Sequence, residues 1–240
     1  MTTIKKTARI AGFLYLLQIP LGVFGIMYLP KALLAGDDWQ QTAGLILSHE
    51  GLLRLSIFSA ILCALVTIAT AYYIMKVLLP VDARYARAIW ICTLIVAPIS
   101  MLNELAHVGA LLLLKNPMVL QAFSPQQIQA LLSLLLQGHA YGMQLVGIFF
   151  GLWLLPMAYL VIRSTYIPRV IGYFLILTCI GYLADFILFF LFPSVRIVIS
   201  EYTWPGEVMM VGWLLTRGVR EEAFRKRIAV SSDPLADPAQ

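Results

Sequence analysis

Residues 51–79 read GLLRLSIFSAILCALVTIATAYYIMKVLL, an almost unbroken apolar run that ends at Pro80. An α-helix rises ~1.5 Å per residue, so about 20 apolar residues cross a hydrocarbon core that is ~30 Å thick. The run is longer than this and carries only two charged residues, Arg54 and Lys76. We therefore predict that it forms a transmembrane helix.

The composition of the whole chain agrees with this reading. Its 240 residues are 61% hydrophobic and 12% charged, whereas soluble domains are roughly 45–50% apolar and about a quarter charged. The chain therefore has too few charged groups to cover a globule in water. The same figures exclude a disordered chain, a collagen, a coiled coil and a disulfide scaffold. We expect an all-α, polytopic membrane bundle.

Five further stretches have the length and hydropathy of a transmembrane helix. The predicted spans are 8–29, 51–79, 88–114, 128–162, 170–191 and 197–216. Before the fourth span, Ser124 is a predicted N-cap and Gln127 would close a capping box. In the sixth, Pro205 and Gly206 are expected to kink the helix.

Shorter segments complete the predicted organisation. We expect Asp37–Ser48 to form a short interfacial helix capped by Asp37 and Asp38, and residues 115–123 to form a loop. Residues 1–229 would form a single transmembrane domain. Residues 230–240, which hold two Asp-Pro pairs, would form a disordered tail.

Basic residues set the predicted orientation, because Lys and Arg accumulate in cytoplasmic loops. Six spans with a cytoplasmic N-terminus place 13 of the 17 basic residues on the cytoplasmic side. The remaining four are Lys31, Arg54, Lys115 and Arg196. Both termini are therefore predicted to be cytoplasmic. The net charge of +5 reflects this topology, and no motif indicates a nucleic-acid partner.

Polar side chains occupy one face of the predicted helix 88–114. Asn103, Glu104 and His107 lie at helical spacing. An ionisable group inside a membrane costs several kcal/mol unless it is paired, so this face should meet other helices or a wet cavity. His139 points away from the face of Gln137 on the fourth helix, and we assign it to a separate interfacial contact.

Three other predicted helices contribute polar groups to the same outer half of the membrane. We predict that they converge in a polar pocket that opens to the extracytoplasmic side. The predicted pocket residues are Arg54, Asn103, Glu104, His107, Tyr182, Asp185 and Glu207. For Asn103, interhelical hydrogen bonding without further chemistry remains an alternative, and Arg54 would act as a counter-ion or extend to the interface.

The charges of this predicted pocket do not balance. Glu104, Asp185 and Glu207 face one permanently cationic residue, Arg54. Burial and mutual repulsion favour the protonated form of a carboxyl group. The pocket would therefore hold protons, a charged His107 or a bound cation.

Metal and catalytic motifs are sparse. Glu104 and His107 form a single Glu-x-x-His pair, whereas di-iron bundles contain this motif twice. With Asp185, they are weak candidate metal ligands. We find no serine elbow and no HExxH motif, and we expect no cofactor. Cys63, Cys92 and Cys179 lie in apolar runs and are read as small buried hydrophobes.

Three functions remain open from these residues. The first is a protein that binds or moves a small solute or lipid through the polar pocket. The second is a non-catalytic accessory or scaffold for a membrane-protein partner. The third is an intramembrane lipid-modifying enzyme that uses Glu104, His107 and Asp185; the sequence favours a non-enzymatic role.

The chain also resembles a known bacterial membrane family, catalogued as domain of unknown function 4386. The resemblance rests on these short sequence motifs: Arg9-Ile-Ala-Gly-Phe-Leu-Tyr-Leu-Leu, Phe149-Phe-Gly-Leu-Trp-Leu-Leu-Pro, Tyr159-Leu-Val-Ile-Arg-Ser, Ile167-Pro-Arg, Ile180-Gly-Tyr, Gly206-Glu-Val and Trp213-Leu-Leu. The resemblance implies a multi-pass protein of the bacterial inner membrane and supplies no reaction or substrate. The recurring positions of the family are matched by Arg54, Arg163, Arg169 and Glu207. The polar helix face of Asn103, Glu104 and His107 is not part of that pattern.

Overall fold

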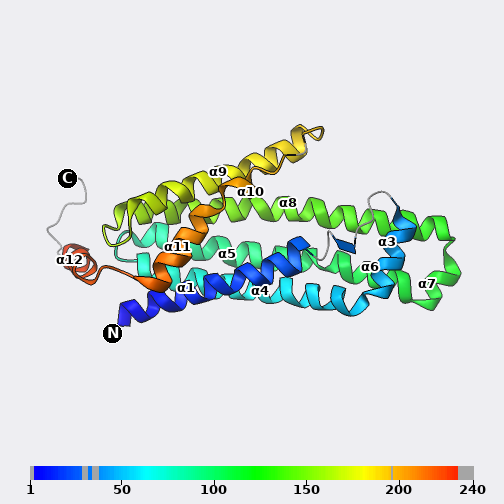
Figure 1. Ribbon diagram of the computed structural model, residues 1–240, viewed down its shortest axis with the longest axis horizontal. Coiled ribbons are helices and arrows are strands. Elements are labelled where there is room, and N and C mark those ends of the chain that lie inside the picture. Colours follow the sequence, from blue (N-terminus) through cyan, green and yellow to red (C-terminus); the bar gives the residue numbers. More distant parts are fainter. Residues whose placement is uncertain (1–2, 29–31, 34–37, 196, 232–240) are drawn as a thin grey trace. The chain divides into compact units, whose positions relative to one another are not determined.

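The computed structural model describes residues 3–28, 32–33, 38–195 and 197–231, and their regular structure is helical (Figure 1). The elements are α1 (Thr3–Gly22), the π-helical η1 (Val23–Tyr28), α3 (Trp39–Ser48), α4 (Glu50–Leu78), α5 (Ala83–Asn103), α6 (Leu105–Lys115), α7 (Pro117–Ala122), α8 (Pro125–Arg163), α9 (Arg169–Leu191), α10 (Ser200–Thr203), α11 (Pro205–Thr216) and α12 (Glu221–Ser231). Asp37, Lys31, Arg196 and the predicted tail from residue 232 onward lie outside the described residues.

Among the described residues, five helical stretches are long and apolar enough to cross a membrane. They are Thr3–Tyr28, Glu50–Leu78, Ala83–Lys115, Pro125–Arg163 and Arg169–Leu191. These correspond to the first five predicted spans. The chain is thus an all-helical protein with several apolar helices of membrane-spanning length.

The sixth predicted helix is broken in two. α10 has 4 residues and α11 has 12, with Trp204 between them. Pro205 stands at the first position of α11, where its missing N–H leaves no helical hydrogen bond unmade. A 12-residue helix is about 18 Å long at ~1.5 Å per residue. α11 alone is therefore too short to count as a span.

The structure confirms one predicted helix start and reveals another where a loop is predicted. The predicted capping box is present: the Ser124 N–H donates to Gln127 Oε1 at 2.8 Å, and the Gln127 N–H donates to Ser124 Oγ at 3.3 Å. The predicted loop at 115–123 is wrong, because α7 forms there. Asn116 caps α7 by accepting from the Met118 N–H at 3.0 Å, and an Asn-Pro pair is a helix start as well as a turn signal.

Contacts divide the chain into two compact units, which are described separately. The first comprises Met1–Leu16, Val66–Val96 and Gly147–Gln240, and the second comprises Leu17–Leu65 and Ala97–Val146. Each unit has its own buried apolar cluster.

In the first unit, α11 packs closely against α9 (Figure 1). Gly206 permits this approach, since a Cβ there would lie 2.6 Å from the Phe174 carbonyl carbon and oxygen. The Thr178 hydroxyl on α9 also donates to the Thr203 carbonyl oxygen at 2.5 Å. Backbone proximity and a hydrogen bond therefore join α10 and α11 to α9.

The connection between α8 and α9 is also buried in the first unit. The Tyr166 hydroxyl donates to the Val77 carbonyl oxygen at 2.8 Å, and the Tyr166 ring packs edge-on against Phe224 of α12. Burial raises the pKa of Tyr166 above its ordinary value. The hydroxyl therefore stays protonated and keeps its donor role at physiological pH.

In the second unit, η1 and the last turn of α1 pack against α4. A Cβ at Gly25 would lie 2.7 Å from the Ala60 nitrogen, and the Ser59 hydroxyl donates to the Leu21 carbonyl oxygen at 2.9 Å. Ile46, Leu53 and other residues of α3, α4, α6 and α8 form the buried cluster. Leu33, Ile46, Leu53 and Leu136 of this cluster also line the cavity described below.

The contact between α9 and α11 gives a first prediction. Gly206→Ala should lower the free energy of unfolding by about 1–3 kcal/mol, because the new methyl group meets backbone that has no room to move. Gly212→Ala on the same helix is the matched control, since nothing lies within 4 Å of a Cβ there. It should be neutral or stabilise by up to about 1 kcal/mol. Unfolding of both variants in detergent, followed by circular dichroism, tests this; equal midpoints would contradict it.

Candidate functional site

The second unit contains a buried carboxylate between two histidines. Glu104 lies between α5 and α6, His107 lies on α6 and His139 on α8, and the three residues are only 2%, 3% and 6% exposed. Glu104 Oε2 is 2.9 Å from His107 Nδ1, and Glu104 Oε1 is 3.1 Å from His139 Nε2. Each carboxylate oxygen therefore pairs with one imidazole ring. We call these three residues the Glu-His-His cluster.

Local geometry holds the Glu-His-His cluster together. Glu104 and His107 are three residues apart, so their side chains meet on one helical face. The two imidazole rings stack with centroids 3.9 Å apart and planes inclined by 35°.

Asn103 and Gly142 position the neighbouring turn of α8. The Asn103 side-chain amide donates to the His139 carbonyl oxygen at 3.0 Å. A Cβ at Gly142 would overlap the Asn103 side-chain oxygen. The absent side chain at 142 therefore leaves room for the hydrogen bond that positions α8 at His139.

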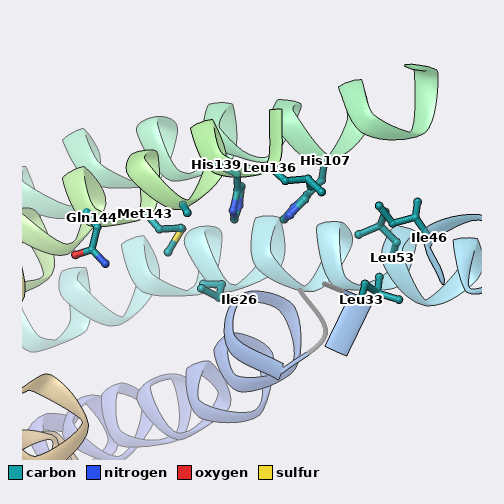
Figure 2. Close-up of a pocket in the computed structure, with 10 residues that line it drawn as sticks. Ile26, Leu33, Ile46, Leu53, His107, Leu136, His139, Met143 and Gln144 are labelled. Carbon is teal, nitrogen blue, oxygen red and sulfur yellow. The ribbon is translucent and has the colours of Figure 1, made fainter. Parts of the chain in front are cut away.

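Both histidines line a cavity of about 210 Å³. Figure 2 shows the two imidazole rings projecting into a space that apolar side chains surround. The lining residues are Ile26, Leu33, Ile46, Leu53, His107, Leu136, His139, Ala140, Met143 and Gln144. The cavity thus has apolar walls, one amide and two imidazoles.

Hydrogen bonding to Glu104 decides what the histidines present to the cavity. If each imidazole donates its N–H to the carboxylate, His107 Nε2 and His139 Nδ1 carry lone pairs. Within the described part of the chain, neither nitrogen has a hydrogen-bond partner. In this tautomer the Glu-His-His cluster therefore offers two acceptors to the cavity, which suit a ligand that donates hydrogen bonds.

A second buried carboxylate, Glu207, lies in the first unit. Its Oε2 accepts from the Tyr15 hydroxyl at 2.5 Å, and its Oε1 accepts from the Tyr182 hydroxyl at 3.2 Å. Glu207 also lies in the first turn of α11, where the helix dipole favours a negative charge. Two tyrosine hydroxyls and a helix N-terminus thus contact this buried carboxyl group, and no basic side chain pairs with it among the described residues.

The two remaining predicted pocket residues make other contacts. Asp185 accepts from the backbone N–H groups of Ile199 and Ser200 at 2.5 and 3.0 Å, so it holds the segment after α9. Arg54 is 63% exposed, and its Nε donates to Glu50 Oε1 at 2.8 Å. Glu50 also accepts from Lys115 Nζ at 2.5 Å.

The predicted pocket residues therefore fall into four sets of contacts. Asn103, Glu104 and His107 come together in the second unit, and Tyr182 meets Glu207 in the first. Sequence reasoning missed two partners, His139 and Tyr15. His139 was assigned to a separate contact because it lies off the face of Gln137, yet it completes the pairing of Glu104 from the facing helix.

The contact of Glu207 with Tyr15 and Tyr182 gives a second prediction. Tyr15→Phe should lower the free energy of unfolding by about 1–3 kcal/mol, the usual cost of leaving a buried polar group without its hydrogen-bond partner. Tyr182→Phe should cost less, since its bond to Glu207 is longer. Tyr173→Phe, which removes an exposed hydroxyl from α9, is the control. Denaturation in detergent measures all three, and the cost of Tyr15→Phe should shrink in a Glu207→Gln background. A loss for Tyr15→Phe that is no larger than that of the control would refute this.

Comparison with known proteins places the chain in a family. An uncharacterized protein of Archaeoglobus fulgidus is 35% identical over 71 residues, which cover 30% of this chain and 43% of that relative. The match thus spans less than half of the relative's length. No solved structure matches the chain. Residues 10–218 match the model of the family described as Domain of unknown function (DUF4386). This match confirms the resemblance noted in the sequence, and the chain belongs to the DUF4386 family.

Proposed function

We propose that the protein is a multi-pass membrane protein that binds or moves a small, largely apolar molecule or lipid group in the cavity beside His107 and His139. The observation that carries this proposal is the cavity itself, in which apolar walls surround two imidazole acceptors. Ligand sites commonly combine apolar walls with a few convergent polar groups.

The size of the cavity limits the ligand. An apolar cavity of about 150 Å³ accepts benzene, whereas drug-sized ligands occupy roughly 300–1,000 Å³. At about 210 Å³, the cavity suits a molecule of benzene size that carries one polar group. The free lone pairs of His107 and His139 favour a donor at that position, such as a hydroxyl or an amine.

An accessory role for a membrane-protein partner is the second candidate. Two contacts favour it. Asp185 accepts from backbone N–H groups, and Arg54 donates to Glu50. These groups support helix connections and take no part in the cavity. A partner-binding role would require only the helical framework.

We further propose six spans with both termini in the cytoplasm of a bacterial inner-membrane protein. The sixth crossing would combine α10, α11 and the residues before them. The 13-to-4 distribution of basic residues supports this orientation. Broken helices also occur in membrane transporters, where they line binding sites. The close packing of Gly206 on Phe174 supports α11 as part of the membrane domain.

Reporter fusions test the topology. Six spans place the N- and C-termini on the same side, whereas five spans place them on opposite sides. A fluorescent protein that folds in the cytosol should be active at either end of the full chain, and alkaline phosphatase should be inactive at both. An alkaline phosphatase that is active at one terminus alone would refute the six-span arrangement.

Photolabelling tests the cavity. A diazirine derivative of benzyl alcohol should label segments of η1, α4 and α8 that line the cavity, and excess benzyl alcohol should compete. Ala140→Trp fills the space and should reduce this labelling fivefold or more. Ala130 is exposed on α8 as Ala140 is, but it does not line the cavity, so Ala130→Trp should leave the labelling unchanged. Peptide mapping by mass spectrometry provides the measurement. Labelling that is equal in both variants would contradict binding in this cavity.

A further inference from the structure

We propose that Glu104, His107 and His139 bind one divalent transition-metal ion, with zinc the best match to their chemistry. This site goes beyond the proposed ligand binding. It rests on the three side chains and does not require that the cavity hold an organic molecule.

The ligand atoms are already close to the spacing that a metal needs. One atom from each residue lies within 4.8 Å of the other two. A tetrahedral zinc ion at about 2.0 Å from nitrogen and oxygen ligands separates them by about 3.3 Å. The observed carboxylate–imidazole distances are 2.9 and 3.1 Å. These distances join Glu104 Oε2 to His107 Nδ1 and Glu104 Oε1 to His139 Nε2. An ion bound by these atoms would replace both hydrogen bonds, and each imidazole would then carry its proton on the nitrogen that faces away from Glu104.

The donor set has the composition of known zinc sites. Two imidazoles and one carboxylate form the three-ligand set of several catalytic zinc centres, which keep a fourth position open. Imidazole nitrogen suits zinc and other late first-row ions, whereas calcium and magnesium prefer oxygen ligands. The chain has three histidines, and two of them lie in this site.

Charge and burial also favour a cation. Metal ligation requires both imidazoles to be neutral, and in that state they and the carboxylate carry one negative charge. No Lys or Arg pairs with Glu104 within the described residues. The three side chains are 6% exposed or less. A divalent ion would offset this buried negative charge. Among the described residues, no other group of three His, Cys, Asp or Glu side chains has this spacing.

The surroundings leave room for a fourth ligand and hold the protein ligands in place. His107 and His139 both line the cavity of about 210 Å³, which has space for a water molecule or a ligand hydroxyl beside an ion. Asn103 holds α8 at His139 through the His139 carbonyl oxygen. Asn103 thus fixes the position of the α8 backbone that carries one of the proposed ligands.

Zinc titration of the full chain tests the proposal. The protein should carry no polyhistidine tag, be stripped with a chelator in detergent, and be titrated with zinc against a fluorescent zinc indicator. We expect one zinc per chain. Glu104→Gln, His107→Gln and His139→Gln should each weaken binding a hundredfold or more. His49→Gln removes the third, exposed histidine and should bind as the wild type does. Binding that survives any of the three site substitutions, or a loss that His49→Gln shares, would overturn the site.

A measurement on the wild type alone covers variants that fail to fold. X-ray absorption at the zinc edge should show two imidazole ligands and one or two oxygen ligands, and cobalt should give the visible spectrum of a tetrahedral ion. A spectrum without imidazole ligands would refute the assignment.

The photolabelling experiment separates the two proposals. Zinc binding without labelling at the cavity would support the metal site and count against the organic ligand. Labelling of the metal-free protein without stoichiometric zinc binding would support the organic ligand and count against the metal site.

Discussion

A hydrocarbon environment cannot solvate a polar group, so each such group in a membrane helix must find its partner within the protein. Glu104 illustrates this constraint. Its two oxygens pair with imidazoles from α6 and α8, so the carboxylate joins two helices. The helices around it are apolar and offer little directional preference by themselves. The Glu104 contact selects which faces of α6 and α8 meet.

The same constraint explains why the acidic residues serve different purposes. Glu207 is stabilised by two tyrosine hydroxyls and the start of α11. Asp185 is stabilised by two backbone N–H groups. A carboxylate that can accept several hydrogen bonds does not need a basic partner. Each of these three acidic residues thus has local partners, and among the three it is Glu104 whose partners line the cavity described above.

Helix positions could be predicted from sequence because apolar length and capping residues are local signals. The capping box of Ser124 and Gln127, the end of α4 near Pro80 and the break at Pro205 all follow from neighbouring residues. The pairing of Glu104 with His107 can also be predicted from sequence, since both residues lie on one helical face. The pairing of His139 with Glu104 and of Tyr15 with Glu207 cannot, because a single sequence does not show which faces of distant helices meet. The α7 loop prediction failed for a local reason: Asn116 and Pro117 suit a turn and a helix start equally well.

Asn103 donates its hydrogen bond to the main-chain carbonyl oxygen at position 139 and not to the imidazole. Any residue at 139 retains a carbonyl oxygen, so the hydrogen bond survives when the side chain is exchanged. Evolution can therefore alter the reactive group on α8 without disturbing the register of that helix. A relative that keeps the equivalents of Asn103 and Gly142 would hold this turn of α8 in the same way, whatever side chain it carries at position 139.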